Sequence, residues 1–333
     1  MITEFPHIHS AHCETGALSG LLRYNGLNIS EPLMFGIGSA MFFAYMPYLK
    51  YNSIPFIAFR TLPGQLIKTF NKRFNIELFR TKYISQKAAM DDLDKILNQN
   101  IPVGLVTNLF YIPYFPESYR FHFNSHNLII YGKENDTYLV SDPIFEEPAK
   151  ISYADLIKAR FSVGIISLKG NLYYIKNVPK SYNLEQMILD GIHASTKNML
   201  SPMPLNGYKG IRYLSKRVKK WPQNLDEKMA KRYLGNIIRM LEEVGTGGSG
   251  FRYMYAAFLQ ESAGILKSDL LLDASNEMTL AGDTWREFSY KAAIICKTSE
   301  PSKELYHETS DIIYRCSEIE ENVFRKLSKL SVK

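Results

Sequence analysis

The chain has 333 residues, a net charge of +7, 46% hydrophobic residues and 22% charged residues, values that suit a soluble protein of one or two domains. Its three cysteines argue against a disulfide framework and for a reducing compartment. The most apolar stretch, residues 36–48, is too short to cross a bilayer, and the first residues lack the basic and apolar regions of a signal peptide. We therefore expect a cytoplasmic protein with no membrane contact.

In chain order, the first half of the sequence alternates helices and strands. Cys13 begins an apolar helix, and further helices are predicted over residues 64–74, 85–98 and 152–160. Strands are predicted over residues 55–60, 101–109, 126–132, 137–143 and 161–168. Residues 170–182, with an edge strand at 172–175, are the expected linker. The pattern predicts an α+β domain over residues 1–175 with a central sheet flanked by helices.

From about residue 180 onward, only helical spacing of apolar residues is found. Helices are predicted over residues 185–200, 225–244, 251–266, 268–297 and 302–330, which gives an all-α domain over residues 176–333. The basic excess lies mostly in this half, and its densest run is residues 216–220 (KRVKK). Such a run is commonly a solvated helix face, and its sharper interpretation is a docking surface for an acidic protein. No nucleic-acid-binding motif accompanies it, and a homo-oligomer stays open.

Three side chains far apart in the sequence suit nucleophilic catalysis. A thiol at a helix N-terminus, such as Cys13, lies in the positive end of the backbone dipole, which favours the thiolate. His126 starts one predicted strand and Asp142 ends the next, so an antiparallel hairpin would bring them together as base and orienting acid. The alternative is that Cys13 is a buried structural thiol and His126 a strand histidine. For Cys296 and Cys316, core packing is expected.

Two further groups are candidates for substrate binding. Glycines at residues 245–250 precede a helix, and Gly247, Gly248 and Arg252 could bind an anion or line a substrate pocket. This segment lacks the Lys-Ser/Thr of a P-loop, and a flexible connection is the alternative. The aromatic side chains of Tyr111 and Tyr114 could line a groove for an acceptor molecule, although core packing explains them equally well.

On these residues, the chain resembles the bacterial family named after the N-terminal domain of butirosin biosynthesis protein H. The matching motifs are His12-Cys13, LLRYNGL at 21–27, SEP at 30–32, FGIGS at 35–39, YIPY at 111–114 and the segments around His126 and Asp142. The helical domain that usually follows in this family looks similar across residues 245–248 and 251–255. The segment from His126 to Pro143 is also similar to the papain-like peptidase domains of bacteriocin-processing transporters.

The resemblance implies a papain-like cysteine-protease fold, with an N-terminal cysteine helix and a central antiparallel sheet, and an acyltransferase activity in secondary metabolism. An acyl carrier protein would supply a thioester, Cys13 would carry the acyl group, and a small amine would accept it. His126 would move the protons and Asp142 would orient it. No cofactor is implied. A hydrolase, peptidase or amidase of the same fold is the first alternative, and a binding protein without catalysis is the second.

The oxyanion donor is the feature in which this chain departs from the papain-like pattern. Such enzymes commonly place a Gln several residues before the cysteine, yet no Gln precedes Cys13, and the six-residue offset falls on His7. The backbone N–H of Cys13 can supply one donor. His7, His9 or His12 could supply another. A metal site is not expected, because these histidines lack a carboxylate partner at helical spacing.

Overall fold

The computed structural model describes residues 4–164 and 167–330. The chain divides into two compact units, and each unit is made of two separate stretches of the sequence. The first unit comprises the described residues of Met1–Glu31 together with Phe70–Tyr182. The second comprises Pro32–Thr69 and the described residues of Asn183–Lys333. The chain therefore leaves the first unit, returns to it, and leaves it again.

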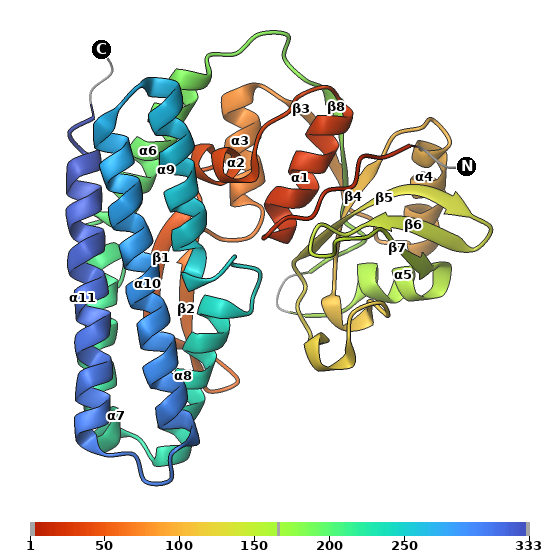
Figure 1. The fold of residues 1–333 in the computed structure, drawn as a ribbon. Coiled ribbons are helices and arrows are strands. Elements are labelled where there is room, and N and C mark those ends of the chain that lie inside the picture. The colour runs from red at the N-terminus through yellow and green to blue at the C-terminus, as the bar shows by residue number, and fades with distance from the viewer. Residues whose placement is uncertain (1–3, 165–166, 331–333) are drawn as a thin grey trace. The chain divides into compact units, whose positions relative to one another are not determined.

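The first unit is built on a six-stranded sheet in which every pair of neighbours is antiparallel. The strand order is β3-β8-β4-β5-β6-β7, with bounds Glu77–Thr81, Leu172–Asn177, Val103–Thr107, His126–Glu134, Thr137–Ser141 and Ala149–Ser152. The helices are α1 (Cys13–Tyr24), α4 (Gln86–Leu97) and α5 (Tyr153–Phe161), with short turns η1 (Leu109–Tyr111) and η2 (Glu117–Tyr119). This is the predicted mixed fold, an antiparallel sheet with an N-terminal cysteine helix (Figure 1).

Strand β5 shows why both faces of the sheet are covered. Side chains alternate between the faces of a strand, and Leu128 and Ile130 join the apolar core that also contains residues of α4 and α5. Ile129 points the other way, toward Gly20 of α1. The cysteine helix therefore packs on one face of β5, and the larger apolar core fills the other.

Two predictions near the end of this unit are wrong. The predicted strand over residues 161–168 is absent from its described residues, because α5 runs to Phe161 and irregular chain follows; residues 165–166 lie outside the described residues. The predicted strand at 172–175 is present as part of β8, but it lies inside the sheet between β3 and β4, not at an edge, and β8 occupies part of the predicted linker. Gly104 of β4 allows this pairing, since a Cβ there would lie 2.4 Å from Tyr173 Cζ of β8.

The second unit combines long helices with a two-stranded antiparallel sheet. Helices α6 (Leu184–Met199), α8 (Glu227–Glu242), α9 (Arg252–Leu266), α10 (Asp269–Lys297) and α11 (Lys303–Leu327) confirm the predicted ones, and η3 (Ser249–Phe251) precedes α9. Figure 1 shows α10 and α11, in blue, running side by side. The prediction includes no helix at α7 (Gly207–Asn224), although its buried side chains recur at three- and four-residue spacing (Tyr208, Ile211, Leu214, Val218 and Trp221).

The structure differs from the predicted domain division over residues 32–69. This stretch holds most of α2 (Glu31–Ile37), the hairpin of β1 (Met41–Tyr51) and β2 (Ile54–Arg60), and the start of α3 (Gln65–Phe74). The hairpin packs against α7 and α8, and the rings of Phe43 and Phe59 contact Trp285 of α10. Burial of these side chains against distant helices places the hairpin in the helical unit, and local sequence carries no sign of it.

Across residues 4–164 and 167–330, no helix is both long and apolar enough to cross a membrane.

Candidate functional site

Cys13 is the first residue of α1, with His12 as its N-cap. The backbone of His12 is extended, and its ring accepts a hydrogen bond from the N–H of Thr15, which caps the helix. Cys13 is 7% exposed, and its thiol lies 3.9 Å from the carbonyl oxygen of Ser125. The predicted position at a helix start is therefore confirmed, and the thiol points toward the beginning of β5.

Glu31 fixes the chain immediately before the cysteine. Its carboxylate accepts hydrogen bonds from the backbone N–H groups of Ala11 and His12, both at 2.9 Å, and from the Thr15 hydroxyl at 2.7 Å. Burial raises the pKa of Glu31 above its ordinary value, although these three hydrogen bonds act in the opposite direction. Because three donors bind one carboxylate, Glu31 stabilises the conformation of the turn that precedes Cys13.

Gly16 allows α1 to approach the segment that carries Asp142. A Cβ on Gly16 would lie 2.5 Å from Pro143 Cβ and 2.7 Å from Ser10 Cβ, much closer than non-bonded carbon atoms allow. The same segment is tied to the N-terminal chain, since the N–H of Ser10 donates to the Pro143 carbonyl at 2.6 Å. Only glycine at this position permits the observed distance between helix and segment.

His126 and Asp142 meet as the predicted hairpin requires. Strands β5 and β6 pair antiparallel through a turn at Asn135, so His126 at the start of β5 lies beside the residue that follows β6. The Nε2 atom of His126 is 2.7 Å from Oδ2 of Asp142, and these side chains are 2% and 0% exposed. The Cys13 thiol is near enough to the imidazole to contribute to raising its pKa. With Nε2 engaged by Asp142, Nδ1 is the ring nitrogen left for the thiol.

Asp142 accepts two further hydrogen bonds. The Tyr114 hydroxyl donates to Oδ2 at 2.8 Å, and the backbone N–H of Ile144 donates to Oδ1 at 3.2 Å. A carboxylate with no exposed surface needs such partners, because burial removes its hydrogen bonds to water. The carboxylate is thus held in orientation by three donors: Tyr114, Ile144 and His126.

Aromatic rings cover the imidazole. Phe115 lies edge-on to His126 with ring centroids 5.3 Å apart, and Phe145 lies edge-on to Phe115 at 4.7 Å and to Tyr114 at 5.4 Å. This apolar cover keeps water away from the ion pair and strengthens its electrostatic interactions.

The protonation of His126 follows from these contacts. Burial alone would lower the pKa of His126, but the charge and hydrogen bond of Asp142, with smaller contributions from Cys13, raise it from 6.5 to about 10. The protonated imidazolium is therefore the stable form at neutral pH.

The histidines predicted as oxyanion donors have other contacts. The Nε2 atom of His7 is 3.0 Å from the Phe145 carbonyl and its Nδ1 is 2.7 Å from Ser141 Oγ, so both ring nitrogens are occupied. Nδ1 of His12 accepts the capping bond from Thr15. An oxyanion role for His7 would require breaking its contacts on either side of Asp142, and the role of His12 stays a prediction.

The predicted substrate-binding residues divide into two groups. Tyr114 contacts Asp142, and the ring of Tyr111 packs edge-on against Phe110 and His122. A substrate-binding role for Tyr111 stays a prediction, whereas the hydroxyl of Tyr114 is committed to the carboxylate.

The structure contradicts the predicted substrate-binding role of Arg252. Its guanidinium is 0% exposed and binds both oxygens of Glu320 at 2.9 Å, while Trp285 donates to the same carboxylate at 2.6 Å. Gly247 and Gly248 have φ angles of +65° and +89°, a backbone conformation that glycine adopts without strain. These residues shape the turn before α9, and a substrate-binding role for Gly247 and Gly248 stays a prediction.

The sequence pattern missed Glu31, Gly16 and Phe115 as parts of the site. Glu31 lies within the SEP motif at 30–32, which carries part of the family resemblance and was the signal available for it, whereas Gly16 lies between two such motifs. Phe115 and the true partner of Tyr114 depend on packing between distant segments and leave no local signal.

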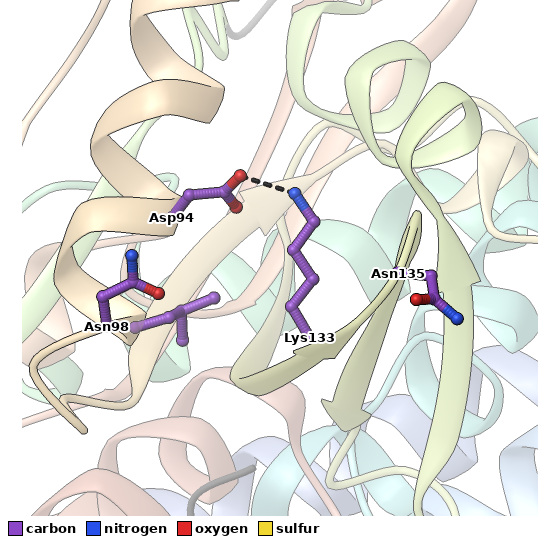
Figure 2. A pocket seen from close by; sticks show the side chains of 5 residues that line it. Asp94, Asn98, Lys133 and Asn135 are labelled. Atoms are coloured by element: carbon purple, nitrogen blue, oxygen red, sulfur yellow. Dashed lines mark hydrogen bonds and ion pairs between the residues drawn. The ribbon is translucent and has the colours of Figure 1, made fainter. Parts of the chain in front are cut away.

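A separate surface pocket of about 220 Å³ is lined by Asp94, Leu97, Asn98, Lys133 and Asn135, and none of the three proposed catalytic residues lines it. Figure 2 shows the Lys133 ammonium pointing to the Asp94 carboxylate, with which it forms an ion pair of 2.5 Å. Within the described part of the chain, no three His, Cys, Asp or Glu side chains gather where they could hold a metal ion.

Comparisons with known proteins identify the family of this chain from its sequence. A protein described as a C39-like peptidase from Bacillus anthracis is similar in structure, with 14% identity over 54% of this chain and 98% of that chain and a TM-score of 0.37. No curated protein matches the sequence. The family model of the butirosin biosynthesis protein H N-terminal domain matches residues 12–143, and a domain of unknown function, DUF4872, matches residues 154–327. The chain therefore belongs to the family that joins a butirosin biosynthesis protein H N-terminal domain to a DUF4872 domain.

Proposed function

We propose that this protein is a cysteine-dependent acyltransferase that moves an acyl group from a thioester to an amine through an acyl-enzyme on Cys13. The observation that carries the proposal is the buried pair of His126 and Asp142, with the Cys13 thiol near enough to help raise the pKa of His126. Thioester exchange onto a cysteine is nearly isoenergetic, and the acyl-enzyme stays reactive toward amines. The resemblance to the butirosin biosynthesis family supports the same chemistry.

The proposed reaction proceeds in two steps that His126 connects. Before the first step, the thiol proton of Cys13 already lies on His126; Cys13 Sγ attacks the thioester carbonyl, and the departing thiol leaves with that proton from the imidazolium. In the second, the amine attacks the acyl group, His126 accepts the amine proton, and the thiol of Cys13 is restored with that proton. The helix N-terminus offers the Cys13 backbone N–H to the oxyanion.

The aromatic cover over His126 favours transfer over hydrolysis. Water and amine compete for the same acyl-enzyme, and exclusion of water is what separates the two outcomes. Phe115 and Phe145 lie against the base and against the tyrosine that contacts Asp142. A water molecule that was to be activated by His126 would have to displace part of this cover.

An acyl carrier protein is the acyl donor we propose. The exposed lysines Lys216, Lys219 and Lys220 lie on one stretch of α7, while Val218 between them is buried. A positive surface of this kind steers an acidic partner toward the protein, with a strength that falls as salt rises. Charge-reversing all three lysines should weaken transfer from a carrier-bound thioester and leave transfer from a small-molecule thioester unchanged.

The test of the proposed function uses intact mass and a matched cysteine variant. Incubation with a set of acyl thioesters should add one acyl group to the wild-type chain and to Cys296→Ser, and none to Cys13→Ser. Addition of a small amine should then discharge the acyl-enzyme into an amide. Release of free acid at the same rate with and without amine would identify a hydrolase instead. A Cys13 that iodoacetamide labels no faster than an ordinary thiol, with or without His126, would identify a non-catalytic binding protein.

A further inference from the structure

Tyr114 shares one carboxylate oxygen with the imidazole. Its hydroxyl donates to Asp142 Oδ2 at 2.8 Å, and His126 Nε2 meets the same oxygen at 2.7 Å. The ring of Tyr114 packs against the rings of both Phe115 and Phe145, with centroids 5.6 Å and 5.4 Å away, and this packing fixes where its hydroxyl points. The Tyr114 hydroxyl therefore has a fixed position beside the ion pair of His126 and Asp142.

The charge on Asp142 depends on these donors most when His126 is neutral. With an imidazolium beside it, the buried carboxylate has an opposite charge as its partner. After the imidazolium gives up its proton, the hydrogen bonds from Tyr114 and the Ile144 backbone become the principal stabilisation of that charge. A donor that stabilises the carboxylate more in the second state makes release of the proton easier.

We propose that Tyr114 is a positioning residue that acts through Asp142 to limit how tightly His126 holds its proton. The proposal rests on the acyl-transfer function only in taking His126 as the group that moves protons. Without the hydroxyl, a buried and desolvated carboxylate would bind the imidazolium so strongly that passing the proton to a departing thiol would become slow. The hydroxyl of Tyr114 and the imidazole of His126 thus both stabilise the negative charge of Asp142 Oδ2.

The hydroxyl remains a donor throughout the working pH range. Burial, followed by the charge of Asp142 and their hydrogen bond, raises the pKa of Tyr114 well above its ordinary value of 10. The phenol therefore keeps its proton while the imidazole loses and regains one. Because Tyr114 does not exchange its own proton, its effect is electrostatic.

The test measures the titration of His126 directly, in full-length protein carrying Cys13→Ala so that no thiolate interferes. The ¹³C resonance of the His126 ring is assigned by its loss in His126→Gln and followed against pH. Tyr114→Phe should raise the pKa of His126 by about one unit, which means that the imidazole binds its proton about tenfold more tightly. Tyr138→Phe is the matched control, because its hydroxyl also donates to a carboxylate, that of Asp94 at 2.7 Å. This control should leave the titration of His126 unchanged.

Replacement of Tyr114 by 3-fluorotyrosine supplies the opposite perturbation with nearly unchanged shape. Its more acidic hydroxyl is a stronger donor, so the pKa of His126 should fall. A value for Tyr114→Phe that equals or lies below that of the control would overturn the proposal, as would a rise with fluorotyrosine. Since these measurements use a chain without its nucleophile, they stand apart from the thioester assay, whose failure would reject acyl transfer alone.

Discussion

Replacement of Gly16 by alanine tests whether the closeness of α1 to the Asp142 segment governs the reactivity of Cys13. The added Cβ would lie 2.5 Å from Pro143 Cβ, whereas carbon atoms in contact are about 3.5–4.0 Å apart. The helix and the segment must therefore separate by about 1 Å. Pro143 is a rigid ring whose carbonyl is bonded to Ser10, so the strain passes to the backbone beside Asp142.

The expected effect on reactivity is larger than the effect on stability. Overpacking costs about 1–3 kcal/mol, and the better helix propensity of alanine returns about 1 kcal/mol, so Gly16→Ala should destabilise the fold by at most about 2 kcal/mol. A displacement of about 1 Å in a reacting group can reduce a rate about 100-fold. Iodoacetamide labelling of Cys13, resolved from Cys296 and Cys316 by peptide mass, measures the rate, and urea unfolding measures the stability.

Gly20→Ala is the matched control in the same helix. Its Cβ would meet Ile129 Cδ1 at 2.9 Å, and that atom is the free end of a flexible side chain that can turn away. The control gains the same helix propensity without moving Cys13. If Gly16→Ala labelled as fast as Gly20→Ala, the reasoning from helix distance to thiol reactivity would be refuted.

Three other predictions concern the ion pairs. Asp142→Asn removes the charge that raises the pKa of His126, so labelling of Cys13 at neutral pH should slow by about tenfold or more; an unchanged rate would remove Asp142 from the site. The pKa of His126 is about 10 in the folded chain and near 6.5 in the unfolded chain, so the folded state binds the proton more tightly. This proton therefore stabilises the fold fully below about pH 6.5, and the stabilisation is lost as the pH rises toward 10. Urea unfolding across this range should show that decline, and His126→Gln should flatten it. Arg252→Met leaves the buried charge of Glu320 unpaired and should cost about 3–5 kcal/mol in urea unfolding, most of it recovered by adding Glu320→Leu; a loss below about 1 kcal/mol would contradict the ion-pair argument.

The central contacts of the site could be predicted from sequence because they depend on local rules. A thiol at a helix start and a hairpin with His126 and Asp142 at its open end follow from apolar spacing and a turn. Their meeting with Cys13 needed only the order of the residues and the family resemblance. The contacts around them could not be predicted in this way. Tyr114 reaches Asp142 across 28 residues of sequence, and no periodic pattern relates the two positions.

The fold was predictable where apolar periodicity is strong and was missed where packing partners are distant. Five helices of the second unit follow from spacing alone. Strand β8 was placed at an edge, because its neighbours β3 and β4 are identified only by tertiary pairing. The glycine-rich turn before α9 has the composition of an anion site, yet its Arg252 pairs with Glu320, 68 residues further on. The glycines in the local sequence predict a turn with positive φ angles, but the local sequence does not predict which residue Arg252 contacts.

The path of the chain between the two units has a consequence for synthesis. The hairpin of β1 and β2 leaves the ribosome long before α7 and α8, the helices on which it packs, have been made. About 150 residues separate the end of β2 from the start of α7, which is roughly 10–30 s at usual rates of translation. During that interval Phe43 and Phe59 lack Trp285, their partner in the finished protein. A nascent chain of this protein therefore carries an apolar hairpin that chaperones can recognise, and a fragment ending near residue 182 would keep that hairpin exposed permanently.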